Sequence, residues 1–164
     1  MHALQALLEE LGISYERYDH APVFTCEEAE AAIPRSDAVQ TKNLFLRDKR
    51  GRRHLLVITS CDKSVDVNHV ARIANADHLS FASAERLQRY LGVAPGSVTV
   101  FGLMNDAQRE VELYVDDAVW GAARWRCHPM VNSATLVVSR GDIARFLAHT
   151  GHTPHVVTLA ERDA

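Results

Sequence analysis

The side chains best suited to chemistry lie in two short stretches. The first, TKNLFLRD, places Lys42 and Asn43 at the start of an apolar segment. The second, HPMVNSAT, places His128 and Asn132 among small polar residues before another apolar segment. A lysine at such an entrance can face solvent, a partner or a ligand anion, and small polar groups before a buried strand can line a pocket. From these residues alone, a solvated Lys42 and a His128 and Asn132 that only bond loop carbonyls remain open alternatives.

Other reactive side chains give weaker signals. The possible metal ligands near the C-terminal end are His149, His152 and His155. They lack the i, i+4 spacing of a zinc-binding helix, so we expect no metal and no cofactor. Cys127 stands beside His128, which suggests a thiol with its base. Neighbours on an extended segment point to opposite faces, however, so such a thiol would need a distant partner.

Composition limits the classes of function. The chain has 164 residues, 47% of them apolar, with a net charge of −3, which suits one domain and gives no broad basic surface. Any contact with RNA would therefore be local and modest in area. The cysteines (Cys26, Cys61 and Cys127) are odd in number and widely spaced, so we expect reduced thiols in a cytoplasmic protein. No apolar run is long enough to span a membrane.

The elements that must position these residues alternate between helices and strands. Helices are predicted around 4–11, 26–33, 67–74, 84–91 and 143–147, with Thr25, Asp66 and Ser83 as N-caps. Strands are predicted at 13–18, 41–48, 54–59, 97–103, 111–115, 135–139 and 155–159. In the strand at 111–115, apolar residues alternate with polar ones, which indicates one wet face. This order predicts a mixed α/β fold, a largely antiparallel or mixed sheet flanked by helices, in one domain covering 1–164.

Five blocks that occur in a fixed order carry a resemblance. They are TKNLFLRD (41–48), LSFA (79–82), LGVAPGSV (91–98), GLMND (102–106) and HPMVNSAT (128–135). Together they resemble the YbaK/prolyl-tRNA-synthetase-associated editing domain family, and in particular its free-standing, ProX-type branch. The similarity extends from about Leu4 to Leu159. It implies a single domain with a curved mixed sheet, acting as a deacylase of mischarged tRNA in the cytoplasm.

The resemblance also implies roles for particular residues. Lys42 would be the central functional residue, followed by Asn43 in the same motif. The residues that would border the aminoacyl pocket are Gly102, His128, Pro129, Asn132 and Thr135. Cys127, Met130 and Gly102 stand where relatives often carry other residues, which leaves the size of the pocket open. Alanine on proline tRNA is the substrate that the resemblance implies, with serine, threonine or cysteine as alternatives. It implies tRNA, and not DNA, as the nucleic-acid partner, and prolyl-tRNA synthetase as a candidate protein partner.

The sparse site suits this chemistry. An aminoacyl ester is already an activated acyl group, so its hydrolysis needs positioning and oxyanion stabilisation more than a strong nucleophile. We expect Lys42 to anchor the terminal nucleotide while water attacks the carbonyl, assisted by the ribose hydroxyl and by backbone N–H groups. Two alternatives stay open: a non-catalytic module that binds the tRNA end or aminoacyl-adenosine, and a thiol-dependent hydrolase that uses Cys127.

Overall fold

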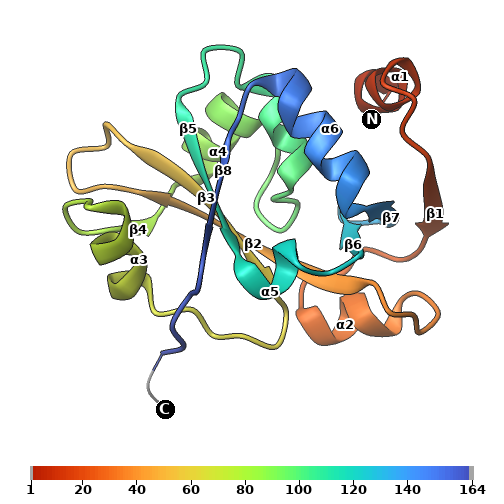
Figure 1. Ribbon diagram of the computed structural model, residues 1–164, viewed down its shortest axis with the longest axis horizontal. Coiled ribbons are helices and arrows are strands. Elements are labelled where there is room, and N and C mark those ends of the chain that lie inside the picture. Colours follow the sequence, from red (N-terminus) through yellow and green to blue (C-terminus); the bar gives the residue numbers. More distant parts are fainter. Residues whose placement is uncertain (1, 163–164) are drawn as a thin grey trace.

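The computed structural model describes residues 2–162, in which eight strands form one mixed sheet. The strands are β1 (Tyr15–Asp19), β2 (Val39–Arg47), β3 (His54–Ser60), β4 (Ser80–Phe81), β5 (Val111–Asp116), β6 (Arg124–Cys127), β7 (Ala134–Ser139) and β8 (Pro154–Val157). Their order is β1-β7-β6-β2-β3-β5-β8, and β4 pairs with β2 outside this path. The pairs of β2 with β6, β3 with β5 and β5 with β8 are parallel. The predicted fold class, a mixed sheet flanked by helices, is confirmed (Figure 1).

Short helices surround the sheet. They are α1 (His2–Glu10), α2 (Cys26–Ala31), α3 (Val67–Ala74), α4 (Ala84–Leu91), α5 (Asp117–Trp120) and α6 (Arg140–Thr150), with the 3₁₀ helix η1 (Val100–Asn105). The predicted N-caps are confirmed, because the side chains of Thr25, Asp66 and Ser83 each accept hydrogen bonds from N–H groups of the first turn. Such caps satisfy donors that the helix itself leaves unpaired, so these starts are encoded locally.

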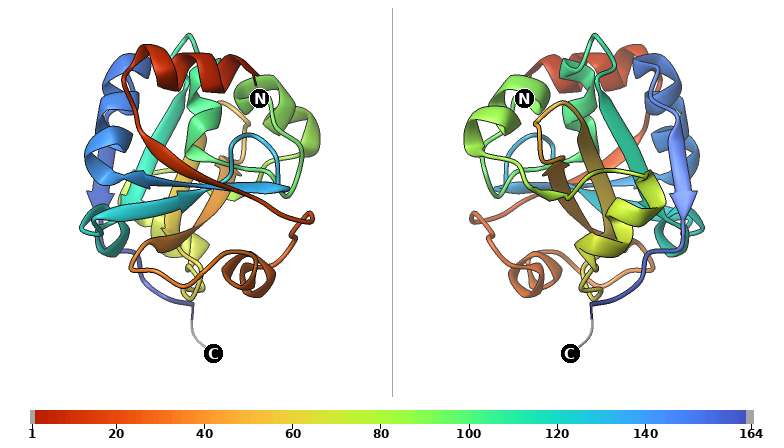
Figure 2. Two further views of the ribbon diagram at one scale, coloured as in Figure 1. Left: turned by 90° about the vertical axis from the view of Figure 1, so that its right-hand side faces the viewer. Right: turned by 90° about the vertical axis from the view of Figure 1, so that its left-hand side faces the viewer.

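Strand β2 changes partners along its length. It pairs with β3 from Thr41 to Arg47. On its other edge it pairs with β6 at Val39 and Gln40, and with β4 at Leu46 and Arg47. Its two ends thus belong to different parts of a curved sheet, and Figure 2 shows β6 and β7 turned across the direction of β2, β3 and β5. The stretch that holds Lys42 lies in the gap between these two pairings.

Strand β3 is the centre of the core, because both of its faces are buried. Leu56 and Ile58 pack into the larger cluster, which also contains residues of α1, α4 and α6. Leu55 and Val57 pack on the opposite face into a second cluster with residues of α3. Burial on both faces explains the nearly continuous apolar sequence of this strand.

Several local predictions were wrong. Residues 97–103 do not form a strand: Thr99 caps η1 by accepting a hydrogen bond from the N–H of Phe101. Strand β6 was missed, because its sequence alternates arginine with Trp125 and Cys127 and its Arg126 is buried. Nor does β5 keep one wet face, since Tyr114 is also buried.

Candidate active site

A cavity of about 360 Å³ brings the two predicted stretches together. Lys42 and Asn43 line it from β2, and His128 lines it from the segment after β6. The remaining lining residues are Val23, Phe24, Thr25, Cys26, Ala29, Gln40, Thr41, Cys61, Gly96 and Val98. A cavity of about 460 Å³ on the Arg35 and Arg126 side shares Gln40 but includes none of the residues predicted for the site.

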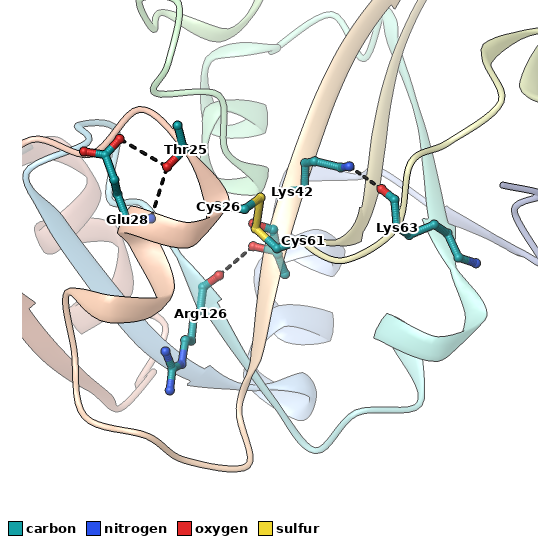
Figure 3. The surroundings of a disulfide bond; sticks show 8 residues. Thr25, Cys26, Glu28, Lys42, Cys61, Lys63 and Arg126 are labelled. Atoms are coloured by element: carbon teal, nitrogen blue, oxygen red, sulfur yellow. Dashed lines mark hydrogen bonds between the residues drawn. A yellow bond between two sulfur atoms is a disulfide. The ribbon is translucent and has the colours of Figure 1, made fainter. Parts of the chain in front are cut away.

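The ammonium group of Lys42 has no carboxylate partner among residues 2–162. Its Nζ donates a hydrogen bond to the carbonyl oxygen of Lys63, as Figure 3 shows. Burial lowers the pKa of Lys42 below its usual range and the charge of Arg162 lowers it further, whereas Asp62 opposes both effects. Because an ammonium group has three donors, two remain available to a ligand anion.

The carbonyl group that holds Lys42 belongs to a firmly anchored turn. Nζ of Lys63 lies 2.8 Å from Oδ2 of Asp116 and donates to the carbonyl oxygen of Leu159 at 2.9 Å. Asp116 is fully buried, and it also accepts a hydrogen bond from the hydroxyl of Thr59 at 2.8 Å. A buried carboxylate therefore fixes Lys63, and Lys63 in turn orients Lys42.

A disulfide bond forms part of the cavity wall (Figure 3). It joins Cys26, at the start of α2, to Cys61, just after β3, with the Cα atoms 5.5 Å apart. The expectation of three reduced thiols is therefore wrong. The two cysteines are 35 residues apart in the sequence, so their pairing depends on the tertiary fold rather than on a local pattern.

The remaining thiol is unsuited to nucleophilic catalysis. Cys127 is 2% exposed, and burial raises the pKa of its thiol to about 12. The thiol is thus protonated at neutral pH and shielded from substrate, whereas the reactive species of a cysteine is the thiolate. This geometry disfavours the thiol-dependent alternative.

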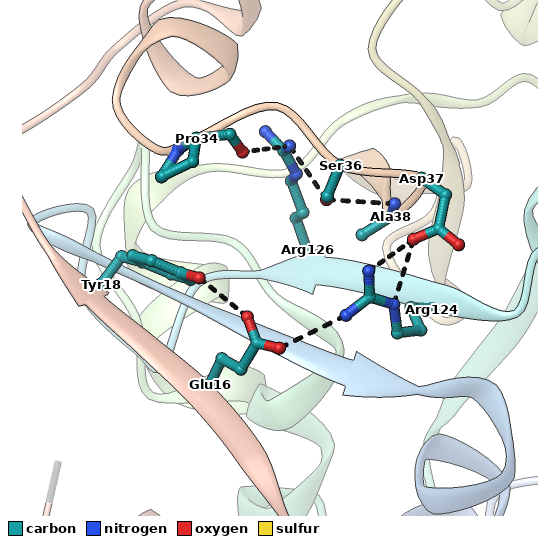
Figure 4. A network of polar contacts seen from close by, with 8 residues as sticks. All are labelled: Glu16, Tyr18, Pro34, Ser36, Asp37, Ala38, Arg124 and Arg126. Carbon is teal, nitrogen blue, oxygen red and sulfur yellow. Dashed lines mark hydrogen bonds and ion pairs between the residues drawn. The ribbon is translucent and has the colours of Figure 1, made fainter.

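Polar contacts fix the loop that leads from α2 into β2. Arg124 donates to Asp37 and lies 3.4 Å from a carboxylate oxygen of Glu16. Arg126 donates to the carbonyl oxygen of Pro34 at 3.0 Å and to the hydroxyl of Ser36 at 3.2 Å. As Figure 4 shows, both arginines reach the loop from β6. They hold the chain just before the cavity residues of β2.

His128 contributes a neutral imidazole. Its Nδ1 donates to the carbonyl oxygen of Ala134 at 3.2 Å, which leaves Nε2 as the second ring nitrogen. Burial lowers the pKa of His128 below its usual range. A ring held in this way can shape the pocket or bond a substrate group without carrying charge.

The other predicted substrate-binding residues do not line the cavity. Gly102 is buried in η1, where an added Cβ would lie 2.9 Å from Cβ of Leu91. Pro129 is buried against a small hollow near α1. Neither residue lines the cavity, so their contact with substrate stays a prediction.

Asn132 and Thr135 support the wall of the cavity. The side-chain amide of Asn132 donates to the carbonyl oxygen of Val23 at 2.9 Å, and the N–H of Val23 donates back to the carbonyl oxygen of Asn132 at 3.1 Å. Thr135 is fully buried, with its hydroxyl 2.8 Å from Nε2 of His20. These bonds hold the segment that carries Val23 and Phe24 beside the site.

Sequence reasoning missed several lining residues. Phe24 is 76% exposed at the cavity, and an aromatic residue directly before a helix cap was the available signal. Gln40 gave no signal, because its place at the wall follows from the pairing of β2 with β6. The side-chain oxygens Oε1 of Gln40 and Oδ1 of Asn43 are buried and accept no hydrogen bond within the described chain.

The free edge of β2 exposes backbone groups to this cavity. The carbonyl of Phe45 faces away from β3, because it accepts from the N–H of Ala82 at 2.9 Å. In an antiparallel pair the direction of backbone groups alternates, so the N–H of Asn43 also faces away from β3. It lies in the gap between β6 and β4 and has no strand partner there. This N–H can serve a ligand oxygen.

The histidines near the C-terminal end contact other side chains of the protein. His152 lies 2.8 Å from Oδ2 of Asp106, and His155 stacks on Tyr114. Within residues 2–162, no group of three or more histidine, cysteine, aspartate or glutamate side chains is placed to hold a metal ion. None of the helices in that range is long and apolar enough to cross a membrane.

Comparisons with known proteins agree with this geometry. A family model described as an aminoacyl-tRNA editing domain matches residues 20–146. The chain is 39% identical, over 96% of each chain, to the prolyl-tRNA editing protein ProX of Acetoanaerobium sticklandii. It is 36% identical to prolyl-tRNA synthetase associated domain-containing protein 1 of Danio rerio, over 95% of this chain and 85% of the relative.

More distant comparisons extend the likeness. The chain is 35% identical over 101 residues to a proline–tRNA ligase of Bacillus licheniformis, covering 17% of that enzyme. A crystal structure described as a candidate trans-editing enzyme for prolyl-tRNA synthetase superposes with a TM-score of 0.75 and 19% identity, over 98% of this chain and 96% of that one. The matched family region spans the segments that carry Lys42 and His128. The chain belongs to the aminoacyl-tRNA editing domain family.

Proposed function

We propose that this protein removes alanine from mischarged proline tRNA by hydrolysing its ester bond to the terminal adenosine. The broader activity, deacylation of mischarged aminoacyl-tRNA, follows from family membership. The observation that carries the proposal is the Lys42 cation, which has no carboxylate partner in the described chain and borders a cavity of about 360 Å³. The names of the relatives support proline tRNA as the substrate and prolyl-tRNA synthetase as a partner.

Lys42 and the backbone of Asn43 have different roles in the proposed hydrolysis. Lys42 binds the phosphate or ribose of the terminal nucleotide and so fixes the ester in the cavity. Water attacks the carbonyl carbon, and the backbone N–H of Asn43 donates to the developing oxyanion. The C–O bond to the ribose then breaks, the ribose oxygen takes the proton from the attacking water, and free alanine leaves. The neighbouring ribose hydroxyl assists the proton transfer.

Two buried side-chain oxygens without a hydrogen-bond partner among residues 2–162 suit the amino group of the substrate. An α-ammonium group needs acceptors, and Oδ1 of Asn43 and Oε1 of Gln40 are acceptors without a partner in the described chain. The neutral Nε2 of His128 is a further acceptor at the same wall. These groups recognise the amino acid backbone, so the choice of side chain depends on the volume that remains.

Limits of selectivity explain why a second site is useful. A synthetase pocket shaped for proline gains only about 1–3 kcal/mol from each methylene group, so it admits some smaller amino acids. A separate cavity that accepts a small side chain and rejects proline corrects these errors. Serine, threonine and cysteine are the alternative substrates of such a cavity.

A deacylation assay with a panel of aminoacyl-tRNAs tests the proposal. We expect Lys42→Ala to lower the rate on alanyl-tRNA(Pro) about 10- to 100-fold, which corresponds to the loss of a charge-assisted hydrogen bond. Lys49→Ala, which removes an exposed lysine in the β2–β3 turn, is the matched control and should keep the wild-type rate. A near-wild-type rate for Lys42→Ala would remove the anchoring role.

The same assay separates the alternatives. Insensitivity to a chelator and to a thiol-blocking reagent supports the proposed mechanism, and loss of activity after thiol blocking supports a cysteine enzyme. Tight binding of aminoacyl-tRNA without turnover supports a non-catalytic module. Faster turnover of seryl-, threonyl- or cysteinyl-tRNA than of alanyl-tRNA(Pro) assigns a different amino acid to the same site.

A further inference from the structure

A second cavity, of about 330 Å³, opens beside Lys42 on the α3 side of β2. Its lining residues are Lys42, Leu44, Ser64, Val65, Asp66, Val67, Asn68, Phe81 and Arg162. Of these, only Lys42 also lines the candidate active site. Successive side chains of a strand point to opposite faces, so Lys42 and Leu44 share the face turned to this cavity. Lys42 therefore stands between the two cavities.

The second cavity is suited to an anion at its Lys42 end. Arg162 lies close enough to lower the pKa of Lys42, and the carboxylate of Asp62 opposes this effect. Neither Lys42 nor Arg162 forms an ion pair within the described chain. The backbone N–H of Arg162 donates to the carbonyl oxygen of Ser64 at 2.8 Å, which holds this arginine at the cavity. The carboxylate of Asp66 is occupied as the cap of α3, where it accepts from the N–H of Asn68 at 3.0 Å. Two adjacent cations thus remain for one ligand anion.

The other end of the cavity is apolar. Phe81 is 64% exposed, and its ring contacts no other aromatic ring within residues 2–162. It comes from β4, whose backbone pairs with β2 opposite Leu46. Leu44, Val65 and Val67 add apolar surface around it. An exposed aromatic face can stack on a nucleobase of any sequence, which contributes substantially to the binding of single-stranded RNA.

We infer that this cavity binds the nucleotide that precedes the terminal adenosine of the tRNA. Its base stacks on Phe81, and the phosphodiester between the last two nucleotides lies between Lys42 and Arg162. A nucleotide combines a flat base with an anion, which matches an aromatic surface beside two cations. The inference rests on the proposed function, because it requires the terminal aminoacyl-adenosine to occupy the first cavity. The protein would then bind the last two nucleotides of the tRNA rather than the terminal one alone.

Equilibrium binding of a ladder of unacylated ligands to the full chain tests this inference. The ligands are adenosine, adenosine 5′-monophosphate and the dinucleotide cytidylyl-(3′→5′)-adenosine, and chemical shifts in an NMR titration report their affinities. We expect each step of the ladder to tighten binding, with the dinucleotide about tenfold tighter than the monophosphate. Phe81→Ala should remove the gain of the dinucleotide over the monophosphate. Arg162→Gln should reduce the gain of the monophosphate over adenosine, because Lys42 remains to bind the phosphate.

Matched controls come from the neighbouring helix α3. Ile73→Ala removes an exposed apolar side chain and Arg72→Gln an exposed cation, and neither residue lines the cavity, so both should keep the wild-type ladder. Equal affinities of dinucleotide and monophosphate in the wild type, or an unchanged ladder in Phe81→Ala, would overturn the inference. Binding of these ligands needs no turnover, so the two proposals can fail separately. If the affinity does not increase along the series while deacylation is normal, only the role of the second cavity is refuted. If the affinity increases as expected but no deacylation occurs, only the proposed reaction is refuted.

Discussion

The Cys26–Cys61 disulfide should stabilise the protein by an amount that the chain length between the two cysteines determines. A cross-link removes conformational entropy from the unfolded chain, and the loss grows with the logarithm of the loop length. For a separation of 35 residues, this relation gives about 4 kcal/mol at 25 °C. In a domain of this size each kcal/mol shifts the melting temperature by about 2–4 °C, so breaking the bond should lower it by about 8–15 °C.

Thermal unfolding followed by circular dichroism measures this effect. The wild type is melted with and without a reductant, beside a Cys26→Ser/Cys61→Ser double variant. We expect the reductant to lower the melting temperature of the wild type to near that of the double variant, and to leave the double variant unchanged. Cys127→Ala controls for loss of a thiol, because a reductant should still destabilise it. If mass spectrometry shows the oxidised bond and the reductant leaves the melting temperature unchanged, the reasoning is refuted.

Three further predictions concern pH, salt and packing. Burial, with the nearby charge of Arg86, lowers the pKa of His54 to about 4 in the folded protein. Between pH 6.5 and 4 the unfolded chain therefore binds a proton at His54 that the folded protein does not bind, so the free energy of unfolding is highest above pH 6.5 and decreases as the pH falls towards 4. Urea unfolding should show a decrease of up to about 3 kcal/mol, and the decrease should be smaller in His54→Gln. An equally large decrease in the variant would show that His54 is not its cause. Two phosphate-binding cations on single-stranded RNA predict a slope of about −1.4 for log affinity against log salt, reduced to about −0.7 in Lys42→Ala, and a slope steeper than about −3 would indicate a further basic surface. Gly102→Ala forces a Cβ to 2.9 Å from Cβ of Leu91, so it should destabilise the protein by about 1–3 kcal/mol in urea, whereas an unchanged midpoint would show that η1 can move.

Locally encoded features were predictable from the sequence. The caps Thr25, Asp66 and Ser83 each bond N–H groups within three residues, so short patterns suffice to identify them. The alternation of β2 and the uninterrupted apolar run of β3 gave the central hairpin. A mixed sheet flanked by helices also followed from the family resemblance, and the structure confirms it; the order of the strands was not predicted.

Features that depend on distant contacts were not predictable. The Cys26–Cys61 bond requires α2 to lie against the end of β3, and no spacing rule encodes that approach. Residues 97–103 were assigned to a strand, because apolar content does not distinguish it from a buried 3₁₀ helix. The buried Arg126 in β6 is stabilised by loop residues some 90 positions earlier in the chain.

In the candidate site, too, locally encoded residues were predictable and residues placed by distant contacts were not. Its Lys42 and Asn43 stand out in the sequence, because polar residues interrupt an apolar strand at its start. Pro129 and Thr135 share motifs with His128 but are buried behind the cavity, since a motif does not state which side chains reach the surface. Arg162 was missed entirely, because it reaches Lys42 only through the packing of the C-terminal segment against Ser64.

The gap between β6 and β4 along β2 has a consequence for unwanted association. Unpaired backbone along a sheet edge normally invites another chain to add a strand, which leads to aggregation. Here the opening is blocked at Gln40 by one neighbour and at Leu46 by the other, so an extended polypeptide has no room to run alongside. The sheet can thus keep unpaired backbone N–H groups accessible to a small ligand while excluding an added strand from another chain.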